Sequence, residues 1–396
     1  MPSCGRQMVG GCHELDAGKA DTGDGSARPL INRVGWQVKS IICQPPSCFD
    51  QYPVSFVSNS KKAFTMQNSS IPPITQAFQF VGGFALTQAA KAFVELGIPD
   101  FLKDGVQTAD EIATHCGTHP ETTFRFLRFL SKQGLVEIDG KDCRLTPVGN
   151  FFRTDVPVNL TKALQIATFE PWQQVWANLG YTLRTGEKAF TYVHKQEPWE
   201  YLSEHPEYGK PFNEYQTHLS KMGAAALVGA YDFSGFKTIC DVGGGHGYLL
   251  KTILEKYPQA RGILFDLPPV VASADLGAAA GRCEVVGGSF FEKIPAADCL
   301  ILKSILHDWS NEKALDILKS CTASLNPGGK ILVMDMVIME GGNPMSYFYD
   351  MHMLVLFGGR ERTQEEMTEL FGKAGLKITR FIPTQGPQFI AEAVLK

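Results

Sequence analysis

The sequence has 396 residues, of which 44% are hydrophobic and 20% are charged, and its formal net charge is −4. This composition predicts a mostly globular chain of about two to three domains. A mildly acidic chain has no general attraction to nucleic acid or to an anionic membrane. The sequence also lacks an apolar run of about 18 residues, the length that would predict a membrane span. We therefore expect neither nucleic acid nor a membrane as a partner.

The 10 cysteines are scattered, and none forms a Cys-x-x-Cys pair. A zinc site therefore has little support, and we expect no metal. Cys240 and Cys299 lie inside apolar runs, where cysteine behaves as a small buried hydrophobic residue. The chain does not begin with a basic segment followed by an apolar one, so the sequence favours a reduced, cytoplasmic protein.

Residues 1–70 are rich in Gly, Ser, Asp and Pro and show no apolar periodicity. This composition is typical of a disordered extension. The acidic residues between Glu14 and Asp24 argue against an organelle transit peptide. A wrongly assigned start, with translation beginning near Met66, would give the same pattern, so both interpretations stay open.

Residues 71–160 have the order of elements of a winged helix. Apolar residues recur at spacings near three and four between Ile74 and Leu102, which predicts a helix. Thr108 and Glu111 have the spacing of a capping box at the start of the next helix. Another helix follows, and the sequence after it predicts a short hairpin that turns at Asp-Gly.

The last of these helices carries Arg125, Arg128 and Lys132, which are suited to phosphate contacts, so DNA binding is one interpretation of the module. No wider basic field surrounds them, and we favour a solvated helix face.

Residues 161–396 are predicted to hold a helical linker and a cofactor-binding domain. The segment 160–230 is helical in pattern and rich in aromatic residues. Those aromatic residues fit either a helical layer between domains or the walls of a pocket for a flat organic substrate. From Lys237 onward strands and helices alternate, which predicts a doubly wound parallel sheet with its ligand at the carboxyl ends of the strands.

The first strand of this domain ends in a glycine-rich turn. Gly243, Gly245 and Gly247 permit a tight turn and a close approach of a ligand to the backbone. Asp266 ends the next strand about 20 residues further on, where a carboxylate accepts ribose hydroxyls. The Gly-x-Gly-x-Gly spacing differs from the dinucleotide pattern and favours S-adenosylmethionine over a nicotinamide cofactor.

These features together resemble the small-molecule O-methyltransferases of the caffeic acid and hydroxyindole type. The resemblance covers residues 72–396. It rests on six motifs in matching order and spacing: Asp241–Gly247, Phe265–Val271, Gly287–Phe291, Leu302–Trp309, Asn326–Lys330 and Gly358–Thr363. It implies an α/β, Rossmann-like methyltransferase domain preceded by a mostly helical winged-helix domain that forms a homodimer.

The resemblance also implies a role for each residue of a cofactor site. The methionine end would be held by Gly243, Gly244 and Gly245, the ribose by Asp266, and the adenine by Ser289 and Phe290, with Lys303 close to the cofactor. The family commonly has Asp where this chain has Ser289. A serine hydroxyl still hydrogen-bonds the adenine amine, but the charge is lost, so we expect weaker cofactor binding.

The same resemblance makes His307 the catalytic base and places Asp335 and Glu361 beside it. A phenol has a pKa of about 10, and an imidazole of ordinary pKa is mostly neutral at pH 7 and suited to accept its proton. Asp335 is shorter than the glutamate usual at its position, so its reach is reduced. Asp308 is interpreted as the N-terminal cap of the following helix.

We therefore predict an S-adenosylmethionine-dependent O-methyltransferase of secondary metabolism that acts on a hydroxylated aromatic or polyketide-like small molecule. One alternative is a winged-helix regulator that uses the cofactor site as a sensor. A second alternative is methyl transfer to nitrogen or carbon, or another S-adenosylmethionine-dependent reaction, because a fold does not fix its chemistry. The sequence does not name the methyl acceptor.

Overall fold

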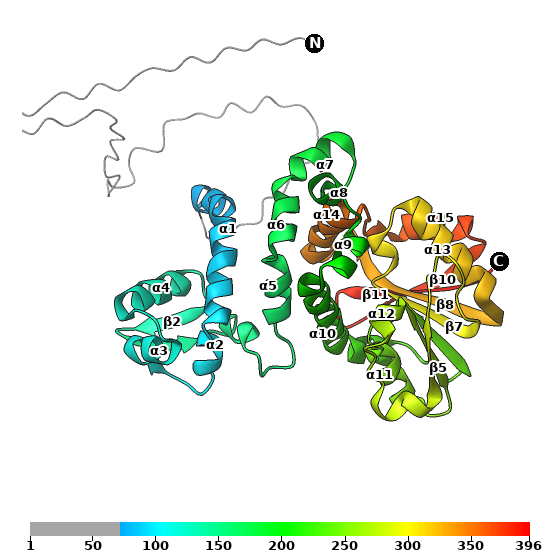
Figure 1. Cartoon of the computed structure of the whole chain (residues 1–396), viewed down its shortest axis with the longest axis horizontal. Helices are drawn as coiled ribbons and strands as arrows, with labels where there is room; N and C mark the ends of the chain where they lie inside the picture. Colours follow the sequence, from blue (N-terminus) through cyan, green and yellow to red (C-terminus); the bar gives the residue numbers. More distant parts are fainter. Residues whose placement is uncertain (1–71) are drawn as a thin grey trace, which may run out of the picture. The chain divides into compact units, whose positions relative to one another are not determined.

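The structure is a computed structural model, and it describes residues 72–396 (Figure 1). The expectation of a disordered extension over residues 1–70 lies outside the described residues. Within the described range, no helix is both long enough and apolar enough to cross a membrane.

The described chain begins with a helical module that contains a small antiparallel sheet in the order β1-β3-β2. Its elements are α1 (Pro73–Glu95), α2 (Ile98–Phe101), β1 (Gln107–Thr108), α3 (Ala109–Cys116), α4 (Pro120–Lys132), β2 (Val136–Asp139), β3 (Asp142–Leu145) and η2 (Gly149–Phe152). The predicted capping box is present, since the Thr108 hydroxyl accepts from the Glu111 amide at 3.2 Å and the Glu111 carboxylate accepts from the Thr108 amide at 2.7 Å. The predicted order of helix, turn, helix and hairpin is confirmed.

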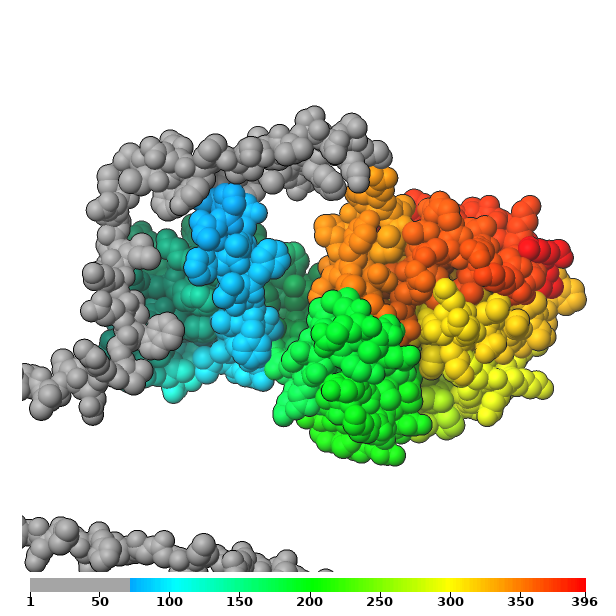
Figure 2. All heavy atoms as spheres, turned by 90° about the horizontal axis from the view of Figure 1, so that it is seen from above, coloured from blue at the N-terminus to red at the C-terminus, as the bar shows by residue number. Residues whose placement is uncertain are grey.

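Helix α1 carries an apolar face that residues 72–396 leave uncovered. Its large apolar side chains are 66–89% exposed at Ile74, Phe78, Phe80, Val81 and Phe84. Only Phe93, near its end, is buried in the core of the module. Figure 2 shows α1 in blue at the surface of the molecule. An exposed apolar patch on a helix is typical of a surface that binds another protein.

A set of helices follows the winged-helix module and packs around aromatic residues. These helices are α5 (Thr161–Ala167), α6 (Glu170–Ala177), α7 (Leu179–Thr185), α8 (Ala189–His194), α9 (Pro198–Glu204) and α10 (Pro206–Ala230). Trp172, Phe190 and Phe212 are buried together with residues of the later helix α14 (Pro344–Phe357). Many of the aromatic residues that the sequence left between core and pocket are therefore core.

The second half of the chain forms a mixed sheet. Its strands are β4 (Thr238–Val242), β5 (Arg261–Asp266), β6 (Cys283–Gly287), β7 (Ala297–Lys303), β8 (Leu325–Ile338), β9 (Arg362–Thr363), β10 (Leu376–Pro383) and β11 (Gln388–Leu395). The order β6-β5-β4-β7-β8 is parallel, as predicted, and the sequence order reverses between β4 and β7. The antiparallel pair β11 and β10 extends the sheet beyond β8, which the sequence did not predict.

Helices cover both faces of this sheet (Figure 1). On one face are α10, α11 (Tyr248–Lys256), α12 (Pro268–Val271) and η3 (Gly277–Arg282), and on the other are η4 (Leu306–Asp308), α13 (Asn311–Ser324) and α15 (Gln364–Lys373). A hydrophobic core lies on each face of the sheet, and alternate residues of β4 point into one or the other. Cys240 and Val242 pack with residues of α13 and α15, whereas Ile239 packs with residues of α10 and α11. This alternation is the period-two geometry of a strand, and it leaves the loops at the carboxyl ends free to form a site.

Candidate active site

The glycine turn after β4 lies at the point where the strand order reverses, which is where such sheets bind ligands. Gly243 and Gly245 have φ angles of 71° and 59°, a backbone region that favours glycine. A Cβ on Gly243 would lie 2.4 Å from Ile305 Cδ1, and one on Gly244 would lie 2.6 Å from Leu264 Cδ1. A Cβ on Gly245 would meet nothing within 4 Å, so this side of the turn is open.

Asp266 is tied to the glycine turn by its carboxylate. One oxygen accepts from the Gly245 amide at 2.8 Å, and the other accepts from the Leu267 amide at 2.7 Å. Burial raises the pKa of Asp266, and the two amide bonds oppose that rise. The structure therefore places Asp266 beside the turn, as predicted, and the turn geometry fits a close backbone approach by a ligand.

The loop after β6 brings Phe290 to the same turn. The Gly288 amide donates to the Asp266 carbonyl at 3.0 Å, which holds the loop against the end of β5. A Cβ built on Gly243 would lie 3.8 Å from the Phe290 ring. Ser289 Oγ accepts from the Phe291 amide at 3.2 Å. Ser289 and Phe290 thus stand at the edge of the predicted cofactor site.

Lys303 ends β7 as a half-buried cation among buried carboxylates. Burial lowers the pKa of Lys303, while the charges of Asp241, Asp335 and Asp308 oppose that effect. Burial also raises the pKa of Asp241 to about 7, and the charge of Lys303 opposes this rise. Lys303 therefore supplies a positive charge that offsets the buried acids Asp241, Asp308 and Asp335, between the glycine turn and His307.

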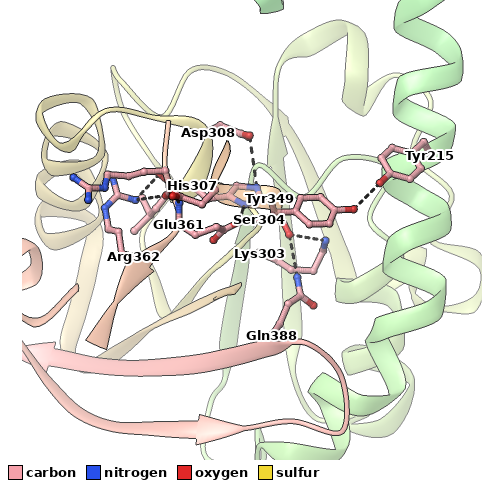
Figure 3. A network of polar contacts seen from close by, with 12 residues as sticks. Tyr215, Lys303, Ser304, His307, Asp308, Tyr349, Glu361, Arg362 and Gln388 are labelled. Carbon is pink, nitrogen blue, oxygen red and sulfur yellow. Dashed lines mark hydrogen bonds and ion pairs between the residues drawn. The ribbon is translucent and has the colours of Figure 1, made fainter. Parts of the chain in front are cut away.

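His307 lies on η4, just after β7, and is held by a carboxylate (Figure 3). Glu361 Oε1 is 2.7 Å from His307 Nδ1. Because a carboxylate accepts this bond, the Nδ1 hydrogen is fixed, and the neutral ring keeps its lone pair on Nε2. Nε2 is 3.6 Å from Asp308 Oδ1, which is too long for a hydrogen bond.

The protonation of His307 differs from the sequence-based expectation. Burial lowers the pKa of His307, but the charges of Glu361 and Asp308 outweigh burial and raise it to about 10. The expectation of an imidazole with ordinary pKa, neutral at pH 7, is therefore wrong. Neighbouring carboxylates favour the charged ring, and the sequence placed only two of them beside it.

Asp308 is not the helix cap that the sequence suggested. Ser310 caps α13, and its hydroxyl accepts from the Lys313 amide at 3.4 Å. The chain makes the turn η4 first, so the helix begins later than expected. Asp308 is instead buried, and burial raises its pKa to about 7. Its carboxylate belongs to the surroundings of His307.

Asp335, in the second half of β8, interacts with the charge of His307 but makes no hydrogen bond to its ring. Its pKa is raised to about 6 by burial, against the charge of His307. Its buried Oδ1 has no hydrogen-bond partner in the described part of the chain, whereas Glu361 bonds directly to the ring. The expectation that either acid would bond the ring is thus met by Glu361, whose side chain is the longer.

Arg362 is a residue of the site that the sequence analysis did not single out. It is buried, and it donates to the carbonyls of Leu306 and Trp309, each at 2.9 Å, and to Asn311 Oδ1 at 3.0 Å. These bonds fix both ends of η4, and hence the position of His307. Its position within the motif Gly358–Thr363 was the sequence signal that could have identified it.

The chain matches two family models. One describes an O-methyltransferase domain and covers residues 176–377, and the other describes an O-methyltransferase dimerisation domain and covers residues 78–155. The chain is also 36% identical over 331 residues to phenazine O-methyltransferase PhzM of Lysobacter antibioticus, which covers 82% of this chain and 97% of that relative. The chain belongs to the O-methyltransferase family.

Solved structures support the same assignment. A crystal structure of LaPhzM matches this O-methyltransferase with a TM-score of 0.74 and 35% identity, over 82% of this chain and all of that one. NcsB1, an O-methyltransferase from neocarzinostatin biosynthesis solved with S-adenosylmethionine and 2-hydroxy-5-methyl naphthoic acid, matches with a TM-score of 0.67 and 30% identity, over 79% and 96% of the two chains.

Family membership decides between the interpretations that the sequence left open. The chain is an S-adenosylmethionine-dependent O-methyltransferase. The interpretation as a winged-helix regulator is not supported, because the winged-helix segment matches a dimerisation domain.

Proposed function

We propose that this enzyme methylates a hydroxyl group on a small aromatic metabolite and that His307 is the general base. The observation that supports this role is the 2.7 Å bond from Glu361 to His307 Nδ1. It leaves Nε2 as the ring atom that accepts a proton, and it stabilises the imidazolium that results. General-base help of this kind is typically worth about 10²–10⁴ in rate.

The residues present fit the cofactor that the family uses. Gly243, Gly244 and Gly245 would hold its methionine end, Asp266 its ribose, and Ser289 and Phe290 its adenine, with Lys303 nearby. The open side of Gly245 supports this placement. S-adenosylmethionine held by these residues would supply an electrophilic methyl group for the substrate oxygen.

The pKa of His307 has to fall for it to act as a base near neutral pH. A second positive charge held in the same site disfavours the imidazolium and lowers this pKa. We therefore propose that His307 reacts from its neutral form, which a positively charged cofactor in this site would favour. Its Nε2 then takes the hydroxyl proton of the acceptor, and Glu361 and Asp335 stabilise the charge that returns to the ring.

Replacement of His307 tests this role. His307→Ala should bind S-adenosylmethionine with unchanged affinity in calorimetry but lose at least about 10² in turnover of a phenolic substrate, because the base is gone. A phenol methylated by the variant at nearly the normal rate would contradict the proposal. A non-aromatic or nitrogen acceptor that is turned over faster than any phenol would contradict the proposed substrate class.

We further propose that the enzyme acts as a homodimer that requires no metal. The dimerisation-domain match and the exposed apolar face of α1 support the first part. For the second part, the chemistry described above needs a base and correct positioning only, so turnover should persist in the presence of a chelator.

A further inference from the structure

His352 is a second histidine beside the catalytic turn, and its protonation is fixed by a neighbour. Trp176 Nε1 lies 3.1 Å from His352 Nδ1 and donates a hydrogen bond to it. An indole N–H only donates, so Nδ1 must be the acceptor. In the charged ring Nδ1 would carry a hydrogen, and this N–H would face the N–H of Trp176 with no acceptor between them. The ring is therefore neutral, and its hydrogen is on Nε2.

The electrostatic surroundings of His352 act in the same direction. Burial lowers the pKa of His352, and the charge of His307 lowers it further, to about 4. His307 and His352 therefore have opposite properties. The first ring gains a proton easily, whereas the second keeps one hydrogen on Nε2 and can only donate it.

Stacking fixes the orientation of the His352 ring. Its centroid is 5.9 Å from that of Trp176 and 5.7 Å from that of Phe348, with interplanar angles of 27° and 22°. Trp176 and Phe348 are themselves stacked, with an interplanar angle of 5°. A side chain locked in this way points its Nε2 hydrogen in one direction.

The helix that carries His352 borders the turn that carries His307, and this hydrogen is bonded to no acceptor in residues 72–396. Helix α14 packs against η4, which carries His307, and the Asp350 carboxylate accepts from the Glu361 amide at 3.0 Å. His352 bonds only to Trp176 among the described residues, and part of its surface is exposed. A donor with a fixed direction and no partner is suited to bind an oxygen atom of a ligand.

Tyr349 supplies a second donor on the same face of α14. It precedes His352 by three positions, and the two ring centroids are 6.1 Å apart. Its hydroxyl is 3.0 Å from that of Tyr215 on α10 (Figure 3). Two hydroxyls that share one hydrogen bond leave one hydrogen for another acceptor.

We propose that His352 is a specificity residue whose Nε2 hydrogen binds a carbonyl or carboxylate oxygen of the methyl acceptor. The preferred substrates would then be hydroxyaromatic compounds with such an oxygen beside the reacting hydroxyl. This inference rests on the proposed function, because it requires the acceptor to lie at His307. The aromatic rings of Trp176 and Phe348 add an apolar wall suited to a flat ligand.

Three probes and one variant test the proposal. The probes are a naphthol, the same naphthol with an ortho carboxylate, and the same naphthol with an ortho methyl ketone, each titrated into protein loaded with S-adenosylhomocysteine. His352→Phe keeps a stacked ring but removes the donor. It should weaken binding of the acid by about tenfold or more and of the ketone by about threefold to tenfold, and binding of the plain naphthol by less than about twofold.

Each outcome of the titrations bears on the proposal. A loss for the acid alone identifies a carboxylate as the group bound, and a loss for the ketone alone identifies a carbonyl. Equal losses for all three probes would show that His352 only supports the fold, and that result overturns the proposal. The proposal is also overturned when the acid and the ketone bind no more tightly than the naphthol to the unaltered protein.

The tautomer gives a readout that does not depend on any substrate. Nitrogen chemical shifts of the unaltered protein should show His352 protonated at Nε2 from pH 6 to pH 8. Trp176→Phe should allow both tautomers. Failure of the proposed function is separable: tight, His352-dependent binding of a probe that S-adenosylmethionine never methylates would contradict the function and leave the role of His352 standing.

Discussion

Glu361 accepts a hydrogen bond from His307 at 2.7 Å with a carboxylate that is almost completely buried. The other oxygen of this carboxylate has no hydrogen-bond partner within the described residues. A buried carboxylate with one bond interacts strongly with that one partner, because little solvent screens the charge. Glu361 therefore both orients the imidazole and keeps its pKa high in the absence of ligands.

Glu361→Gln should change the pH dependence of the enzyme as well as its rate. The amide oxygen still accepts from Nδ1, but the negative charge is lost, so the pKa of His307 falls below its present value of about 10. The rise of kcat/KM with pH, which reports the free enzyme, should then move to lower pH by more than about one unit. The plateau should fall about tenfold or more, because the imidazolium is less stabilised.

Steady-state kinetics from pH 6 to pH 10 provide the measurement. Glu366→Gln is a control, because Glu366 is partly exposed and pairs with Arg360 rather than with the histidine. Glu366→Gln should leave the pH midpoint of the rise in kcat/KM unchanged. An identical midpoint in Glu361→Gln and the unaltered enzyme would show that the charge of Glu361 does not set the pKa of His307.

Ser289→Asp should tighten cofactor binding. The resemblance to the family places an aspartate here, and a carboxylate accepts more strongly from an amine than a hydroxyl does. We expect Kd for S-adenosylmethionine to fall about threefold to tenfold in calorimetry. Ser289→Ala serves as the counterpart and should raise Kd. Unchanged Kd in both variants would mean that residue 289 does not contact the adenine.

Much of the cofactor half could be predicted from the sequence, because its signals are local. A strand, a glycine turn and an acid at the end of the next strand are adjacent in the sheet, so spacing alone predicted that Gly243, Gly245 and Asp266 lie together, as they do. The antiparallel pair β10 and β11 was not predicted, because pairing of β11 with β8 joins segments that are distant in the chain.

The parts of the site that depend on contacts between distant segments were not predictable in the same way. Asp308 resembled a helix cap, since nothing in the sequence showed that η4 would delay the helix and bury the carboxylate. His352 gave no signal, because its role depends on Trp176, which lies 176 positions away. The pKa of His307 likewise depends on carboxylates from separate elements.

Charges on the exposed face of α1 should separate a dimer into monomers. Val81 and Phe84 are 81% and 68% exposed in the single chain, so a double substitution to Asp costs the isolated fold little. Burial of those charges at an interface is strongly unfavourable. Light scattering coupled to size-exclusion chromatography should give the molar mass of a dimer for the unaltered chain and that of a monomer for the variant. Leu183→Asp is a control on α7, because Leu183 is 67% exposed outside this face, and it should remain dimeric.

Arg362→Gln should lower stability and activity together, because η4 depends on this side chain. The substitution removes the hydrogen bonds to the carbonyls of Leu306 and Trp309 and leaves these buried groups without their partner. Burial lowers the pKa of Arg362 while the charge of Asp335 opposes this shift, so the change also leaves a buried acid with less compensation. We expect a loss of about 2–5 kcal/mol in the free energy of unfolding, because each buried carbonyl left without a partner costs about 1–3 kcal/mol.

Denaturant unfolding of Arg362→Gln beside Arg360→Gln provides a matched comparison. Arg360 pairs with Glu366 at 2.6 Å near the surface, where both side chains are more than 40% exposed, so its replacement should cost less than about 1 kcal/mol. Below the unfolding transition, Arg362→Gln should also turn over more slowly while it binds S-adenosylmethionine normally, because His307 is displaced and the glycine turn is not. Equal losses of stability in the two variants would show that Arg362 does not hold η4 in place.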